Sequence, residues 1–130
     1  MSSLRTELAR VRLEVAEMAA LHPRAHPSIR RILDAVAEAW CVSPADVLSD
    51  RQHARLVVPR HAVMALARQL TPHSQAAIGR MLRRDHTTVM HGVAQHARRC
   101  AEDPTLAARC AAIAHHLTQE IENGEDQARG

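Results

Sequence analysis

Residues 85–99 (D-H-T-T-V-M-H-G-V-A-Q-H-A-R-R) place two kinds of side chain on opposite sides of one predicted helix. At about 100° per residue, the core side carries Val89, Val93, His96 and Cys100, with Gly92 beside them. The opposite side carries Thr87, His91, Ala94 and Arg98. This second face is small and polar, and threonine offers both a hydroxyl for base edges and a methyl for contact with thymine. The pattern predicts a helix that enters the major groove of DNA.

The preceding residues, 71–84, provide a helix and a tight turn that would position this face. Thr71 or His73-Ser74 can begin the first helix, because Ser and Thr side chains accept hydrogen bonds from the unpaired amides at a helix start. Gly79 allows the two helices to pack closely. Asp85 would begin the second helix, where its carboxylate can cap the next amides and favours the positive end of the helix dipole. We therefore predict a helix-turn-helix.

The ordered run R-D-H-T-T-V-M-H at 84–91 resembles the signature of the C-terminal DNA-binding domain of the bacterial chromosomal replication initiator DnaA. Residues 57–71 resemble the helix before it, and residues 32–49 resemble the helix and short helix that open that domain. The resemblance covers roughly residues 27–99. It implies an all-α, Trp-repressor-like helix-turn-helix fold, double-stranded DNA with initiator-box-like sites as the partner, and a regulatory role in replication initiation or transcription.

The resemblance also implies which residues meet DNA. His86, Thr87 and Thr88 match the family residues that meet base edges, and Asp85 either fixes that first turn or accepts from a cytosine amino group. In the polar loop 49–55, Arg51 is the better match and Arg55 the second for an arginine in the minor groove, while a solvated loop is the alternative. The other predicted DNA-binding residues are Arg60, His61, Arg68, Thr71, His73, Ser74, Gln75, Arg83, Arg84 and His91.

Arg60 and Arg68 are expected to lie toward the DNA backbone, and His61 stands where the family often has Gln. A second departure lies in the turn. The family usually has a pair of glycines or similar small residues before the Arg of its signature, whereas this chain has M-L-R-R at 81–84, one residue shorter. Arg83 thereby adds a cation beside the predicted DNA face.

The charge distribution supports a nucleic-acid partner. All 17 basic residues are arginine, and residues 51–99 hold nine of them against one acidic residue, a balance of +8. Residues 1–50 have a net charge of −1 and residues 100–130 of −4, so the overall +3 conceals a basic central block. A basic block that coincides with the motif is what a phosphate-facing surface requires.

The composition predicts an all-helical core. Phe and Tyr are absent and Trp40 is the only aromatic residue, so the core must be built from Ala, Leu, Val, Ile and Met. We expect Trp40 to be a core anchor at the end of a helix that Ser28 caps, followed by a short helix beginning at Ser43-Pro44 and a helix over 57–70 with Pro59 in its first turn. The three cysteines form no C-x-x-C pair, and we interpret them as reduced core thiols of a cytoplasmic, nucleoid-associated bacterial protein.

Four segments are expected: an N-terminal helix and linker (1–26), the DNA-binding domain (27–100), a C-terminal helix (101–123) and a disordered tail (124–130). The helix over 2–20 has an apolar seam at Leu4, Leu8, Val11, Val15 and Met18. A similar seam in the last helix comprises Leu106, Cys110, Ile113, Leu117 and Ile121. The seams either pack within the chain or form a homodimer through the terminal helices.

Several kinds of chemistry lack their residues. There is no lysine and hence no phosphate-binding loop of the G-K-[ST] type, so we expect no nucleotide and no ATPase module. His86, His91 and His96 are spaced by five and do not share a helix face, so we expect no metal, cofactor or catalysis. No run is apolar for long enough to predict a membrane partner. The alternative to DNA binding is a protein-interaction scaffold that keeps the fold and uses the terminal helices as its interface.

Overall fold

The computed structural model describes residues 25–128, with the backbone alone for 124–128. Along this part the chain forms α2 (Ile29–Ala39), α3 (Pro44–Leu48), α4 (Ala54–Leu70), α5 (Gln75–Leu82), α6 (His86–Glu102) and α7 (Pro104–Ala128), and residues 25–128 contain no strand. The prediction of an all-α fold is confirmed. The predicted helix over 2–20 and its seam lie outside the described residues. Among the helices described, none combines the length and apolar character needed to cross a membrane.

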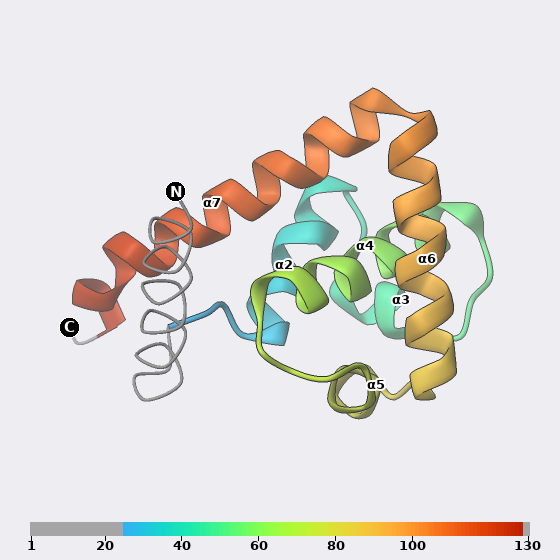
Figure 1. The fold of residues 1–130 in the computed structure, drawn as a ribbon, viewed down its shortest axis with the longest axis horizontal. Helices are drawn as coiled ribbons and strands as arrows, with labels where there is room; N and C mark the ends of the chain where they lie inside the picture. Colours follow the sequence, from blue (N-terminus) through green and yellow to red (C-terminus); the bar gives the residue numbers. More distant parts are fainter. Residues whose placement is uncertain (1–24, 129–130) are drawn as a thin grey trace, which may run out of the picture.

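Helix α4 is the centre of the arrangement, because it contacts each of the other described helices. In Figure 1, α6 crosses one end of α4, α5 lies below, and α7 runs diagonally away from α6 on the opposite side from α5. The fully buried side chains are aliphatic, and the largest of them are Ile32, Met64, Leu66, Ile78 and Leu117. Trp40 is only half-buried at the end of α2, and the guanidinium carbon of Arg109 lies 5.0 Å from its ring centroid. The aliphatic core predicted from composition is thus observed, with Trp40 at its margin.

Three serines set the starts of three helices, as predicted. The side chains of Ser28, Ser43 and Ser74 accept hydrogen bonds from the backbone amides three residues further on, at 3.0, 3.0 and 3.1 Å. Thr71 does not begin α5. Its side chain is buried and its hydroxyl donates to the Ala67 carbonyl at 2.6 Å, so it closes the end of α4 instead.

Helix α4 begins at Ala54, three residues before the predicted start at residue 57. Pro59 therefore lies inside the helix rather than in its first turn, where it has no N–H to donate to the carbonyl four residues earlier. The earlier start shortens the polar loop, and Arg55 now belongs to the first turn of α4. Arg51 remains on the loop between α3 and α4.

The seam of α7 packs on the rest of the domain. Three seam residues, Leu106, Cys110 and Leu117, are buried together with the adjacent Ala114, while Ile113 and Ile121 are partly buried. The Glu120 carboxylate accepts two hydrogen bonds from Arg31 of α2, at 2.7 and 3.0 Å, which fixes the helix further along. The C-terminal seam therefore packs within the chain over residues 106–117. The backbone helix continues to Ala128, past the predicted boundary at residue 123.

Two of the three cysteines, Cys41 and Cys100, are not the core thiols that the sequence predicted. Cys41 is exposed and Cys100 is half-buried, whereas Cys110 is buried. Burial raises the pKa of the Cys110 thiol to about 11, which keeps it protonated and unreactive at neutral pH. Cys41, the residue after the C-cap of α2, adopts a left-handed backbone conformation with φ of 56°, so it turns the chain rather than filling the core.

Two glycines set how closely the helices approach. A Cβ atom on Gly92 of α6 would overlap the Met64 sulfur of α4, and a Cβ on Gly79 of α5 would lie 2.5 Å from the Arg84 carbonyl oxygen. Because the second obstacle is backbone, a side chain at residue 79 could not be accommodated without moving the turn before α6. Gly79 thus permits a close approach to the backbone of residues 84–85, just before α6, rather than to α6 itself as predicted.

Candidate nucleic-acid interface

Helix α6 has the two faces that its sequence predicted. Val89, Gly92 and His96 are buried against the domain. The other side and the first turn are exposed, comprising His86, Thr87, Thr88, His91, Ala94 and Arg98. The family resemblance predicts base contacts for His86, Thr87 and Thr88 in the exposed first turn. The structure therefore leaves free the surface that a helix must present to a major groove.

Asp85 precedes α6 as its N-cap residue, but its carboxylate makes no side-chain cap to the helix amides. It accepts a hydrogen bond from the Thr87 hydroxyl at 2.7 Å instead, and one carboxylate oxygen lies 3.5 Å from His86 Nδ1. The Thr87 bond, assisted by the charge of His86, lowers the pKa of Asp85. Since the Thr87 hydroxyl donates its proton to Asp85, its oxygen lone pairs can accept from the amino group of adenine or cytosine.

The turn between α5 and α6 depends on a left-handed arginine. Arg83 ends α5 with φ of 58° and ψ of 46°, a conformation that helix ends usually assign to glycine. The Arg84 amide donates to the Gly79 carbonyl at 2.7 Å, which closes the turn. The shortened turn is thus accommodated by the backbone of Arg83, and its side chain is exposed beside the first turn of α6.

Arg60 departs from its predicted place at the DNA backbone. Its side chain is buried, with the residue 7% exposed, and Nε donates to the Val47 carbonyl at 2.6 Å. Nη2 donates to the carbonyls of Ser49 at 2.7 Å and Arg51 at 3.0 Å. Burial, followed by the nearby charge of Arg84, lowers the pKa of Arg60. The reason for the inward direction is that three backbone carbonyls of the α3–α4 segment find their donor here.

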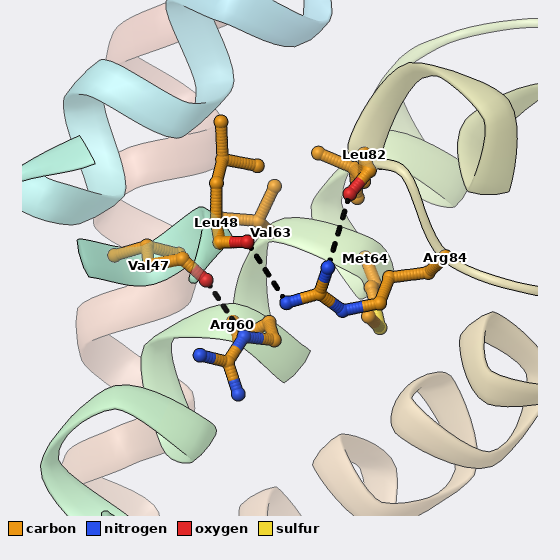
Figure 2. A pocket seen from close by; sticks show the side chains of 7 residues that line it. All are labelled: Val47, Leu48, Arg60, Val63, Met64, Leu82 and Arg84. Atoms are coloured by element: carbon orange, nitrogen blue, oxygen red, sulfur yellow. Dashed lines mark hydrogen bonds between the residues drawn. The ribbon is translucent and has the colours of Figure 1, made fainter. Parts of the chain in front are cut away.

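Arg84 also points inward. Its Nη2 donates to the Leu48 carbonyl at 2.9 Å and to the Ser49 carbonyl, and Nη1 lies 3.7 Å from the Asp50 carboxylate. Figure 2 shows Arg60 and Arg84 reaching this segment from two sides, Arg60 at the backbone oxygen of Val47 and Arg84 at that of Leu48. The Arg84 side chain is only 15% exposed, so it is oriented toward the protein rather than toward a ligand.

Four further predicted residues are partly buried or hydrogen-bonded within the protein. His61 is half-buried, with Nδ1 2.8 Å from Nη1 of Arg99, and burial together with the Arg99 charge lowers the pKa of His61 to about 4. A neutral His61 therefore accepts from Arg99 at neutral pH. The Ser74 hydroxyl is engaged as the α5 cap, and the half-buried His73 packs edge-on against His26 with ring centroids 5.4 Å apart. Gln75 is half-buried in the first turn of α5.

The remaining predicted arginines are exposed: Arg51 on the α3–α4 loop, Arg55 and Arg68 on α4, and Arg83 at the turn. Two further exposed arginines are absent from the predicted DNA-binding residues: Arg80 at the end of α5, and Arg98, which the helical spacing had already placed on the outer face of α6. The helical spacing could have placed Arg80 on the surface, because it lies two residues, and so about 200° around the helix, from the buried Ile78 and Leu82. Along residues 51–99 the single acidic residue is Asp85, so these cations are not offset within that block.

These features define a class: a small helix-turn-helix domain whose second helix presents an exposed polar first turn beside a set of outward arginines. A family model described as "Bacterial dnaA protein helix-turn-helix" matches residues 29–95, and the chain belongs to that family. It is accordingly a DNA-binding domain. The family resemblance inferred from residues 84–91 is confirmed.

Curated relatives agree with the family match. Residues of this chain are 45% identical over 80 residues to the chromosomal replication initiator protein DnaA of Bartonella quintana (strain Toulouse), covering 61% of this chain and 16% of that protein. The protein of the same name from Neisseria meningitidis serogroup C is 42% identical over 77 residues, covering 58% and 15%. That from Caulobacter vibrioides (strain NA1000 / CB15N) is 43% identical over 81 residues, covering 62% and 16%. The matched region spans about a sixth of the length of these relatives.

Proposed function

We propose that the chain binds double-stranded DNA sequence-specifically at sites resembling the initiator box, and that it regulates replication initiation or transcription. The observation that carries this proposal is the exposed first turn of α6, where Thr87 is held by Asp85 beside exposed His86 and Thr88. A protein with this role would be located at the nucleoid, in the cytoplasm of a bacterium.

In the proposed complex the first turn of α6 enters the major groove. The Thr87 hydroxyl, donating to Asp85, accepts from a base amino group, and its methyl can meet thymine. His86 and Thr88 flank it and contact neighbouring base edges. His91, one turn further along, contacts the groove wall. The buried Val89 and Gly92 seat the helix on α4 and leave this side free.

Exposed arginines supply the contacts around that helix. Arg51 extends from the α3–α4 loop and reads the adjacent minor groove, whose negative potential attracts guanidinium groups. Arg55, in the first turn of α4, is the second candidate for that position. Arg68 and Arg83 meet phosphates, which fix orientation and supply affinity without carrying sequence information directly.

The scaffold alternative has less support than the DNA reading. Its interface was to be the seams of the terminal helices, but the α7 seam is buried on the domain through Leu117. A protein that had lost DNA binding would also have no reason to keep a balance of +8 over residues 51–99.

A gel shift on a duplex carrying one initiator box, against a scrambled duplex of the same composition, tests the proposal. We expect the box to be bound at least about a thousandfold more tightly at physiological salt, the lower limit typical of specific DNA binders. Binding to both duplexes should weaken steeply with salt because arginines displace counterions from phosphates. Equal binding to the two duplexes would contradict sequence recognition, and no binding to either would favour the scaffold.

A further inference from the structure

The Ser49 carbonyl oxygen is the point at which two arginines from distant parts of the chain meet. Arg60 of α4 donates to it through Nη2 at 2.7 Å, and Arg84, from the segment between α5 and α6, donates to the same oxygen through its own Nη2. A carbonyl oxygen has two lone pairs and can accept both bonds. Three structural units therefore converge on one backbone atom: α4, the turn before α6, and the loop that follows α3.

Neighbouring carbonyls extend the contact on both sides of Ser49. Arg60 binds the carbonyls of Val47 and Arg51, and Arg84 binds that of Leu48. The carbonyls of residues 47, 48, 49 and 51 thus accept hydrogen bonds from two planar guanidinium groups, and we call this set of contacts the clamp. Arg51, whose own carbonyl is one of the acceptors, lies at the end of this segment with its side chain exposed.

The arrangement places two like charges close together in a poorly solvated position. Burial and the charge of Arg84 both oppose the charged form of Arg60. Apolar side chains of similar size would avoid this penalty, but they could not donate to the carbonyls of 47–51. The presence of two arginines here is explained if their hydrogen bonds serve to fix the position of the α3–α4 loop relative to α6.

We propose that Arg60 and Arg84 are positioning residues that join the Arg51 loop to the turn before the recognition helix, so that the minor-groove and major-groove contacts engage DNA as one unit. Arg84 is adjacent to Asp85, the N-cap of α6, so any shift of the loop is transmitted to the start of that helix. This inference rests on the proposed function, in which Arg51 and the first turn of α6 meet adjacent grooves.

The decisive variant is Arg84→Lys, which keeps the charge but lacks the planar fork that reaches two carbonyls. Arg51→Ala should weaken binding to the box by about tenfold in the parent protein, within the range of one good DNA contact. In the Arg84→Lys background the same change should cost less than about threefold, because Arg51 is no longer held in place. Arg68→Ala, which removes an exposed arginine of α4, is the matched control and should cost the same in both backgrounds.

A measurement without DNA tests the clamp separately. Backbone order parameters for residues 50–53 from ¹⁵N relaxation should be near 0.85 in the parent protein and should fall toward 0.6 in Arg84→Lys. Arg60→Lys, which leaves Arg84 in place, is the second variant and should behave alike if Arg84→Lys does not fold. Unchanged order parameters, or an equal Arg51→Ala loss in both backgrounds, would overturn the proposal and make Arg84 an independent contact. If the parent failed to prefer the box, the proposed function would fail while the order parameters still decided the clamp.

Discussion

Arg60 and Arg68 lie on the same helix, eight residues apart, and differ in their exposure and in their hydrogen bonds. Arg60 is 7% exposed and donates to three backbone carbonyls, whereas Arg68 is exposed on the last turn of α4. Eight residues correspond to a rotation of about 80° around a helix, enough to move a side chain from the interior to the surface. A basic block in the sequence therefore mixes two functions: some arginines organise the protein, and others face the ligand.

The sharpest test of this difference is to remove each arginine in turn. Arg60→Ala should destabilise the fold by about 2–4 kcal/mol, because the Val47 and Arg51 carbonyls lose their donor and the Ser49 carbonyl keeps only its bond from Arg84. Arg68→Ala should change the free energy of unfolding by less than about 0.5 kcal/mol, as is usual for exposed positions. Urea unfolding measures both. Equal, small changes would mean that Arg60 is not structural.

In DNA binding, the pair of variants to compare is an exposed arginine against an exposed threonine. Thr87→Ala, and separately His86→Ala, should cost roughly 1–3 kcal/mol on the preferred duplex and change binding to random DNA very little. Arg68→Ala should weaken both duplexes alike and lower the slope of log affinity against log salt by about one. Titrations on both duplexes at several salt concentrations measure this, with melting curves as the control for folding. Parallel losses for the threonine variant would show that α6 does not read bases.

His61, directly after Arg60, is also directed toward the protein, and its titration makes the free energy of unfolding depend on pH. Its pKa is lowered to about 4 in the folded protein, whereas an unfolded histidine titrates near 6.5. The unfolded chain therefore binds the additional proton first, and stability present above pH 6.5 is lost as the pH falls toward 4. The His61 contribution amounts to about 2 kcal/mol between pH 7.5 and pH 5. His61→Gln should flatten the pH dependence of unfolding by that amount, and an unchanged slope would contradict the assignment.

The smallest expected effect concerns Arg83, where an exposed arginine imposes a backbone cost. Arg83→Gly should stabilise the fold by about 0.5–1 kcal/mol, because glycine adopts the left-handed conformation without a Cβ penalty. The same change should weaken DNA binding and lower the slope of log affinity against log salt by about one, because one phosphate contact is lost. Thermal melting and salt-dependent titration are the two measurements. A variant that gains stability and keeps full affinity would remove Arg83 from the interface.

Local patterns predicted the elements well, for reasons that lie within a few residues of chain. The two faces of α6 follow from the spacing of Val89, Gly92 and His96, and the serine caps follow from the amides directly after them. The start of α4 was misplaced because Pro59 was assigned to a first turn, while the structure places it inside the helix.

The directions of the arginines could not be predicted in the same way. Arg60 is oriented by carbonyls 9–13 residues away, and Arg84 by carbonyls 35 and 36 residues away. These acceptors become neighbours only after the helices have assembled. The orientation of Thr87 was missed for a different reason: Asp85 was expected to bond to backbone amides, and in the structure it binds the hydroxyl two residues on.

The position of Trp40 gives the molecule an optical property of its own. With no Phe or Tyr in the chain, near-ultraviolet emission comes from this single indole, which lies beneath Arg109 of α7. Trp40 and Arg109 border the same surface pocket as Glu102, the last residue of α6, while His86 begins that helix about 24 Å away along its axis. Emission should therefore follow the docking of α7 and remain nearly silent while the other end of α6 engages DNA.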